Sequence, residues 1–234
     1  MSGTGGGEVE RVIVKLSGSI FKADIEQSDL KPFIDVFSDL GKRGVKMVLV
    51  AGGGKNARRY IAAAKDMGAD ESTLDEVGII VSRLNAMLLV AGFGGLAYPS
   101  VPTSLGEVAE AFEAKGIVVT GGLHPGQSTN ATACLIAERV RADLFLNTTS
   151  VDGVYTKDPK LSGDAEKLST VTVEKLKEIL SGSSMGAGTY ELMDTVALKI
   201  IERSQIPSRI VLCSPEVIKQ VLEGGDAGTL LVSR

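Results

Sequence analysis

The sequence predicts an α/β protein in which helices cover both faces of a central, mostly parallel β-sheet. Short runs rich in β-branched residues alternate with amphipathic segments along the chain, and this alternation is typical of strand–helix–strand units. Glycine supplies 28 of the 234 residues, about 12% against a typical ~7%. Three of the expected strands run directly into small or glycine-rich loops. We therefore expect a three-layer αβα sandwich with several sites of close backbone approach.

The first part of the chain contains four expected strands, each a short apolar run. They are placed at residues 9–16, 45–50, 117–120 and 143–147. The intervening helices are placed at residues 30–42, 55–67, 74–90, 104–114 and 130–140. Ser28 or Asp29 is expected to cap the first helix, and Ser104 forms a capping box with Glu107 at the fourth.

After residue 147 the pattern of elements changes. Residues 151–160 are expected to form a turn and short extended pieces, because Asp-Gly and Asp-Pro pairs are turn signals. Helices follow at residues 173–180 and 194–204, strands at 209–212 and 229–232, and a helix opens at Pro215 behind Ser214. We expect a flexible leader over residues 1–8 and one domain over residues 9–234, with a soft boundary near residue 147 between two lobes of one sheet.

Composition excludes several classes of function. A net charge of −4, no tryptophan and 4% aromatic residues argue against a nucleic-acid-binding surface. Cys134 and Cys213 lie in apolar stretches without metal-type spacing, so two free thiols are favoured over a disulfide, as in a reducing compartment. No run approaches ~20 uninterrupted apolar residues, so we expect neither export nor membrane insertion, and a cytoplasmic location.

The glycine-rich loops at residues 17–19, 52–54 and 121–129 follow consecutive expected strands. In a parallel sheet the carboxyl ends of the strands share one edge, where ligands bind in open α/β folds. Loops that lead into helix N-termini offer unpaired amides to an anion. Three such loops favour a phosphate-binding edge over three unrelated tight turns.

Three cations lie close to these loops. Lys15 is placed beside the first loop, where its ammonium could neutralise a transferring phosphoryl group; the alternative is an edge lysine that faces solvent. Arg58 and Arg59 occupy the first turns of a helix, where cations oppose the helix dipole, so an anionic ligand explains them better. Arg58 is the stronger candidate because it is nearer the loop.

Other chemistries lack the residues that they require. His124 is the only histidine, which argues against Ser-His-Asp hydrolysis and against zinc chemistry. No GxxxxGK[ST] motif is present, and the GxGxxA match at residues 92–97 follows a helix, which is the wrong context for a dinucleotide fold. Phosphoryl transfer from ATP to a small acceptor is therefore the expected reaction.

With these residues identified, the sequence resembles the amino-acid kinase superfamily, and within it the archaeal type of uridylate (UMP) kinases. The resemblance covers residues 12–232. The matching segments are KLSGS at 15–19, GGGKNARRYI at 52–61, SRLNAMLL at 82–89, VTGGLHPGQST at 119–129, VDGVYTKDP at 151–159, and AGTYELMD with ALKIIERS at 187–204. The glycine triplet and VDGVY indicate only the superfamily, whereas HPGQST together with RLNA is more specific to the uridylate kinase branch.

The resemblance implies a division of the chain between two nucleotides. The lobe at about residues 9–147 would bind UMP through Gly53, Asp75, Leu123, His124, Pro125, Gly126, Gln127, Ser128 and Thr129. The ATP phosphates would meet Gly18, Ser19, Gly54 and Arg58. The lobe at about residues 148–234 would hold the nucleoside of ATP through Thr149, Ser150, Tyr155 and Asp158. Asp75 would accept the ribose hydroxyls.

The resemblance also implies a mechanism and an assembly. The γ-phosphoryl group of MgATP would pass in line to the α-phosphate of UMP, with Mg²⁺ held mainly by nucleotide oxygens and no metal cage built by the protein. Lys15 would stabilise charge, and Asp152 would orient Lys15 or nearby amides, unless it simply forms a turn. A homohexamer built as a trimer of dimers is expected, with UTP as a candidate inhibitor. The helix at 74–90 could supply a subunit contact or be buried inside the monomer.

Two rival hypotheses remain open from the sequence. One keeps the fold and changes the acceptor to a carboxylate, a carbamate or isopentenyl phosphate. The other is a nucleotide sensor or storage protein that binds ATP or UTP without turnover.

Overall fold

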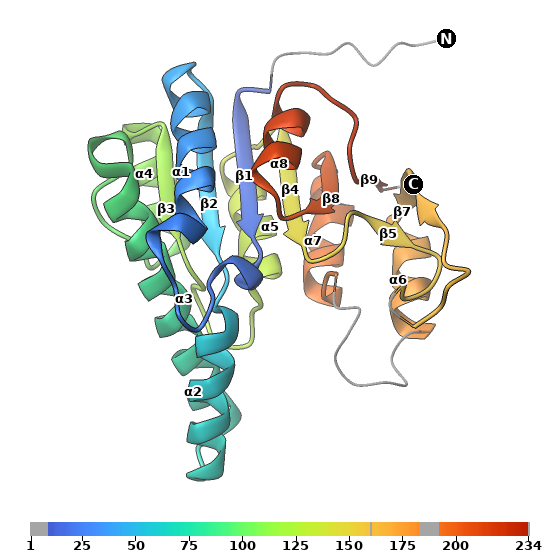
Figure 1. Cartoon of the computed structure of the whole chain (residues 1–234), viewed down its shortest axis with the longest axis horizontal. Helices are drawn as coiled ribbons and strands as arrows, with labels where there is room; N and C mark the ends of the chain where they lie inside the picture. Colours follow the sequence, from blue (N-terminus) through green and yellow to red (C-terminus); the bar gives the residue numbers. More distant parts are fainter. Residues whose placement is uncertain (1–8, 160, 183–191, 234) are drawn as a thin grey trace.

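The computed structural model describes residues 9–159, 161–182 and 192–233, which contain one seven-stranded sheet with helices on both faces (Figure 1). The expected leader at 1–8 and residues 187–191 of the last matching segment lie outside the described residues. The strands are β1 (Arg11–Leu16), β2 (Lys46–Ala51), β3 (Ile117–Thr120), β4 (Leu144–Thr149), β5 (Val154–Tyr155), β6 (Lys167–Leu168), β7 (Thr170–Thr172), β8 (Ser208–Leu212) and β9 (Thr229–Val232).

Eight α-helices connect these strands within the described residues. They are α1 (Gln27–Lys42), α2 (Gly54–Asp66), α3 (Glu71–Phe93), α4 (Leu105–Ala114), α5 (Thr129–Arg139), α6 (Val173–Gly182), α7 (Thr195–Ser204) and α8 (Pro215–Leu222). Two short 3₁₀ turns lie at Gly18–Ile20 and Gly94–Leu96. All the helices expected from the sequence are therefore present, most of them shifted by a few residues at their ends.

The sheet has the strand order β3-β2-β1-β4-β8-β9-β7. Every neighbouring pair is parallel except β8 and β9, which run antiparallel. A separate two-stranded antiparallel sheet is formed by β5 and β6. The prediction of a mostly parallel sheet is confirmed, and the carboxyl ends of β1, β2, β3 and β4 lie on one edge.

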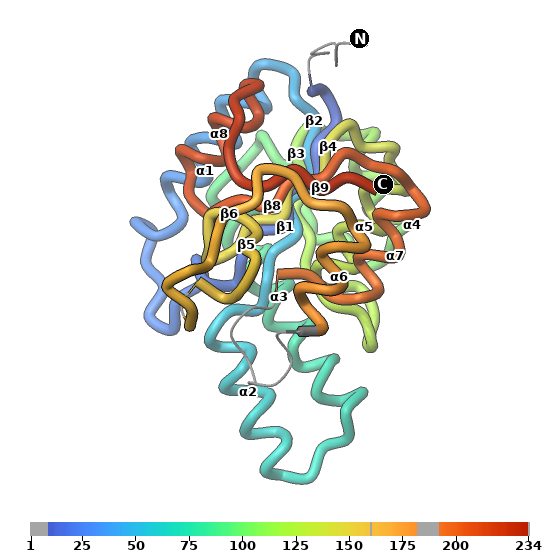
Figure 2. Tube along the Cα trace, turned by 90° about the vertical axis from the view of Figure 1, so that its right-hand side faces the viewer, coloured from blue at the N-terminus to red at the C-terminus, as the bar shows by residue number. Residues whose placement is uncertain are grey.

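Side chains of the central strands alternate between two buried cores, one on each face of the sheet. Ile13 packs into one core, whereas Val12 and Val14 pack into the other. The first core is completed by α4, α5, α6 and α7, and the second by α1, α3 and α8. Figure 2 shows α1 and α8 on one side of the strands and α4, α5 and α7 on the other. The expected three-layer αβα sandwich is confirmed.

The start of α1 differs from the sequence prediction. Neither Ser28 nor Asp29 caps it: Glu26 is the N-cap, and Asp29 completes a capping box by accepting a hydrogen bond from Glu26 N at 3.1 Å. The predicted caps Ser104 of α4 and Ser214 of α8 are confirmed. The short strand β7 was not predicted, since three residues are too few to give a clear alternating pattern.

Helix α3 is unusually apolar for a helix that is not fully covered. The segment Glu71–Leu96 is long and apolar enough to cross a membrane by length and composition alone, with a mean hydropathy of 1.7. This is weak evidence, because a core helix meets the same criterion, and α3 buries Ala86 and Leu89 in the core. Together with α2, its first turns extend away from the sheet (Figures 1 and 2).

Candidate functional site

The loops after β1 and β2 pack backbone against backbone. A Cβ atom added to Gly18 would lie 2.7 Å from the amide nitrogen of Gly54, and one added to Gly52 would lie 2.8 Å from that of Gly18. Gly52 N also donates a hydrogen bond to Leu16 O at 3.2 Å. Gly54 itself has φ +69°, a left-handed conformation that favours glycine. Two of the three predicted phosphate loops therefore meet on one rim because glycine allows it.

The third loop, which follows β3, reaches the same rim across α3. A Cβ atom added to Gly121 would lie 2.7 Å from Arg83 N, and Ser82 Oγ accepts a hydrogen bond from Gly122 N at 2.8 Å. A pocket of about 180 Å³ lies between this loop, α2 and α3. Its lining residues are Gly53, Ile61, Asp75, Gly78, Ile79, Ser82, Gly122, Gln127 and Thr129.

Four of the residues predicted to hold the acceptor line this pocket: Gly53, Asp75, Gln127 and Thr129. Asp75 Oδ2 accepts a hydrogen bond from Gly126 N at 2.6 Å, which ties the start of α3 to the loop. Gln127 Oε1 is buried without a hydrogen-bond partner in the described structure. A buried acceptor without a donor is costly, so a ligand donor in the pocket would relieve it.

The remaining residues of the predicted acceptor loop lie outside the pocket lining. His124, Pro125 and Gly126 are exposed, and Leu123 is buried in the core between the sheet and α5. Ser128 caps α5 by accepting a hydrogen bond from Ala131 N at 3.0 Å. Leu123 can therefore reach a ligand only through its backbone.

Lys15 is not an edge lysine. Strand β1 is central, and Lys15 lies in register with Val50 of β2 and Asn147 of β4. Burial lowers the pKa of Lys15 to about 8, although the nearby Cys213 and Asp194 act in the opposite direction. A partly desolvated ammonium at a rim of glycine loops is suited to stabilising a transferring phosphoryl group.

Asp194 is a polar residue of this region that the sequence analysis did not single out. Its Oδ1 caps α7 by accepting hydrogen bonds from Val196 N at 3.0 Å and Ala197 N at 2.9 Å. Its Oδ2 accepts a hydrogen bond from the Ser128 hydroxyl. An Asp before an amphipathic segment signals only a cap, so its position near Lys15 required the tertiary structure.

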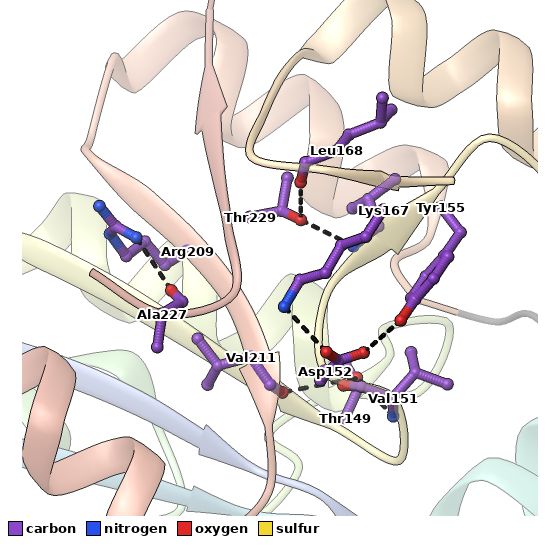
Figure 3. Close-up of polar contacts among 11 residues, drawn as sticks. Thr149, Val151, Asp152, Tyr155, Lys167, Leu168, Arg209, Val211, Ala227 and Thr229 are labelled. Carbon is purple, nitrogen blue, oxygen red and sulfur yellow. Dashed lines mark hydrogen bonds and ion pairs between the residues drawn. The ribbon is translucent and has the colours of Figure 1, made fainter. Parts of the chain in front are cut away.

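The expectation that Asp152 orients Lys15 is wrong, because Asp152 pairs with other side chains. Its carboxylate accepts hydrogen bonds from Lys167 Nζ at 2.8 Å and from the Tyr155 hydroxyl at 2.7 Å, as Figure 3 shows. The Lys167 contact is the main cause of a lowered pKa for Asp152. The carboxylate that raises the pKa of Lys15 is that of Asp194, whereas Asp152 holds the β5–β6 hairpin closed.

The same hairpin is attached to the main sheet through Thr229 (Figure 3). Its hydroxyl accepts a hydrogen bond from Val154 N at 2.8 Å and donates one to Leu168 O at 2.5 Å. Thr149, at the end of β4, is buried and donates its hydroxyl to Val151 O at 2.8 Å. The loop that the resemblance assigns to the ATP nucleoside is thus fixed to β4 and β9.

The other residues predicted to bind ATP are distributed along this edge. Ser19 Oγ donates to Ser17 Oγ at 2.9 Å within the first loop. Arg58 is exposed in the first turns of α2, and no carboxylate pairs with it in the described part of the chain. Ser150 is exposed and Asp158 is buried.

Two further predictions concern thiols and metals. Cys134 and Cys213 are both free, as expected, and burial raises the pKa of each thiol. No group of three or more His, Cys, Asp or Glu side chains among the described residues is arranged to hold a metal ion.

The sequence analysis also missed three polar side chains of α3 that contact the glycine loops. Ser82, Arg83 and Asn85 lie in the SRLNAMLL segment, and Ser82 and Asn85 are buried. Polar residues at buried positions of an otherwise apolar helix are the signal that could have identified them.

Comparisons with known proteins agree with this geometry. The model of the amino acid kinase family matches residues 10–212. The chain is 43% identical over 199 residues to the uridylate kinase of Methanoregula boonei, with 85% of each chain covered. It is 45% identical over 203 residues to that of Sulfolobus acidocaldarius, covering 86% of this chain and 88% of the relative. The crystal structure of uridylate kinase from Archaeoglobus fulgidus superposes with a TM-score of 0.85 at 38% identity, covering 94% of this chain and 99% of the other.

Proposed function

The chain belongs to the amino acid kinase family, and from that premise we propose that it transfers the γ-phosphoryl group of ATP to UMP, which yields UDP and ADP. The observation that carries the proposal is the meeting of three glycine loops on one rim beside a pocket. Relatives named uridylate kinase support UMP as the acceptor. The product UDP is a precursor in pyrimidine nucleotide synthesis.

The reaction brings two anions together, so positioning and charge neutralisation dominate it. An oxygen of the UMP α-phosphate attacks the γ-phosphorus of ATP while the bond to the β-phosphate oxygen breaks, in line. No general base is required, because the attacking oxygen is already anionic. Lys15 supplies positive charge at the point of transfer, and the loop amides of Gly18, Ser19 and Gly54 contact the phosphates of ATP, with Arg58 beside them.

We assign UMP to the lobe at residues 9–147 and the nucleoside of ATP to the lobe at 148–234. In the first lobe, Asp75 at the start of α3 accepts the ribose hydroxyls, and the apolar Ile61 and Ile79 of the pocket wall face the nucleotide. In the second lobe, the nucleoside contacts the hairpin that Asp152 holds closed, through Thr149, Ser150, Tyr155 and Asp158.

Mg²⁺ is the metal that we propose to accompany ATP, bound mainly by phosphate oxygens. We further propose that the protein is cytoplasmic, that it assembles as a homohexamer built from three dimers, and that UTP inhibits it. The exposed side chains of Ile80, Leu84 and Met87 on α3 support a contact between subunits, because an apolar stripe on a helix is normally covered.

A panel of acceptors tests the proposed function. The purified chain is incubated with MgATP and, separately, UMP, dUMP, CMP, a carbamate, an amino-acid carboxylate and isopentenyl phosphate, and ADP release is measured. UMP is expected to give the highest kcat/KM. A better turnover with any acceptor other than a pyrimidine nucleotide would replace the assignment, and nucleotide binding without ADP release would point to a sensor.

A further inference from the structure

Helix α3 holds the acceptor loop through one arginine. Arg83 donates three hydrogen bonds to backbone carbonyls: from Nε to Gly122 O at 3.0 Å, and from one terminal nitrogen to Leu123 O at 3.1 Å and Thr103 O at 3.2 Å. Gly122 and Leu123 begin the loop after β3, and Thr103 precedes the cap of α4. Arg83 is absent from the residues that line the pocket. It binds the loop without lining the pocket.

Asn85 makes an equivalent contact with the other glycine loop. Its Nδ2 donates to Gly52 O at 2.8 Å and to Gly53 O at 3.2 Å. Residues 83 and 85 of one helix thus each capture two successive carbonyls, one pair in the loop after β3 and one pair in the loop after β2.

The captured carbonyls determine where the neighbouring amides point. In a trans peptide the C=O of one residue and the N–H of the next point in opposite directions, and the described chain contains no cis peptide bond. Binding of the Gly122 and Leu123 carbonyls by Arg83 therefore turns the N–H groups of Leu123 and His124 away from the guanidinium. Neither of these two amides has a hydrogen-bond acceptor among the described residues.

The Gly53 and Gly54 amides show the same arrangement on the second loop. The carbonyls that precede them are bound by Asn85, and neither N–H donates to an acceptor within the described segments. Unpaired amides that point away from the side chains binding the preceding carbonyls are groups that can bind an anion. Since unpaired N–H groups are rarely tolerated away from water, they are available for a ligand.

We propose that Arg83 is a positioning residue for the acceptor nucleotide: it binds the Gly122 and Leu123 carbonyls and so holds in place the loop whose residues Gly122, Gln127 and Thr129 line the pocket. The inference rests on the proposed function for the identity of that nucleotide. Arg83 itself does not line the pocket. The loop contacts the acceptor before and during transfer alike, so Arg83 supports binding more than the chemical step.

The test compares three arginine variants in steady-state kinetics and in amide hydrogen exchange. Arg83→Met removes the guanidinium and keeps much of the apolar stem, and Arg83→Lys retains one donor group. Arg203→Met is the matched control, since Arg203 makes two side-chain hydrogen bonds away from the site, to Glu138 on the surface of α5. We expect Arg83→Met to raise KM for UMP about tenfold or more while kcat and KM for ATP stay within about twofold. Arg83→Lys should give an intermediate KM for UMP. Arg203→Met should leave kcat and both KM values unchanged.

Two results would overturn the proposal. One is a KM for UMP that is unchanged in Arg83→Met, and the other is an equal rise in KM for both substrates, which a general loss of structure would cause. If Arg83→Met does not fold, Arg83→Lys carries the same comparison at smaller amplitude.

Hydrogen exchange separates this proposal from the proposed function. Arg83→Met should speed exchange of the hydrogen-bonded amides in residues 121–129, which are those of Gly122, Gly126 and Gln127, and leave the hydrogen-bonded amide of Gly52 at the wild-type rate, whatever the substrate is. Unchanged exchange in 121–129 counts against the role of Arg83. Absence of UMP turnover by the wild-type protein, with faster exchange in the variant, counts against the proposed function alone.

Discussion

Asp194 accepts a hydrogen bond from the hydroxyl of Ser128, so the capping residues of α7 and α5 are joined directly. Ser128 belongs to the loop assigned to UMP, and Asp194 is one of the charges that act on Lys15. One carboxylate therefore connects the acceptor loop with the charge that we assign to phosphoryl transfer.

Asp194→Asn should shift the pH dependence of the reaction with little loss of stability. Asn is as good an N-cap as Asp, so the cap of α7 is retained and the free energy of unfolding should change by less than about 1 kcal/mol. Removing the negative charge removes an interaction that raises the pKa of Lys15, so that pKa should fall further. The alkaline limb of kcat/KM should move to lower pH. An unchanged limb would mean that Lys15 does not sense Asp194.

The wild-type reaction should itself lose activity in mildly alkaline solution. Burial lowers the pKa of Lys15 to about 8 in the free protein, and its charged form is the one that we propose to stabilise the transferring group. We expect kcat/KM to fall as pH rises through about 8, and kcat to fall at higher pH, because bound nucleotide anions favour the ammonium. Lys15→Ala should lower kcat at least about tenfold, or ~1.4 kcal/mol, and abolish this limb. A kcat within about threefold of the wild-type value would assign the role elsewhere.

Lys15 should also be a source of instability, with the opposite dependence on pH. The ordinary pKa of a lysine side chain is 10.5 and that of Lys15 in the folded chain is about 8, so between these values the unfolded chain binds more protons and stability rises with pH. Below pH 8 the whole desolvation cost is present. Lys15→Met should therefore have a higher free energy of unfolding than the wild type in neutral solution, and the difference should shrink above about pH 10. Urea denaturation at several pH values measures this difference in the free energy of unfolding. A Lys15→Met variant that is less stable than the wild type at neutral pH would contradict a desolvated Lys15.

The order of strands and helices could be read from the sequence because it depends on local patterns. The alternation of β-branched runs with amphipathic segments determines α/β layering, and the caps Ser104 and Ser214 are signalled by neighbouring residues. The cap of α1 was missed because Glu is a poor capping residue, and Glu26 acts there only together with Asp29. The antiparallel pairing of β8 with β9 depends on the direction in which the chain re-enters the sheet after α8, and no local sequence pattern encodes that direction.

The candidate site was predictable where glycine marks it and not where partners come from distant segments. Gly18, Gly52 and Gly54 are visible in the sequence, and their convergence follows from a parallel sheet. The resemblance implied that Asp152 orients Lys15 or nearby amides, yet Lys167, which pairs with Asp152, comes from a hairpin that has no clear pattern. Arg83 resembles any solvated helix residue until the loop that it binds is placed beside it.

Gly18→Ala should separate the two loops that meet at the rim. The added methyl group would lie 2.7 Å from the backbone nitrogen of Gly54, and backbone cannot give way as a flexible side chain can. We expect kcat/KM for ATP to fall by about tenfold or more. Gly116→Ala is the matched control, since its Cβ would meet nothing within 4 Å. Equal activity of the two variants would contradict the close packing of the loops.

Lys167→Met tests whether the hairpin contributes to the ATP side of the site. Lys167 is 37% exposed and pairs with Asp152, and Lys177, also 37% exposed, pairs with Glu202 on α7. Each variant loses one partly exposed ion pair, so Lys167→Met and Lys177→Met should lose similar stability, below about 1 kcal/mol. Only Lys167→Met should raise KM for ATP, by about threefold to tenfold, because Asp152 then loses a partner that keeps the β5–β6 hairpin closed. KM for UMP should stay unchanged in both, since the acceptor pocket lies at the other end of the rim. A rise in KM for ATP that is equal in the two variants would mean that the hairpin contact matters only as a surface ion pair.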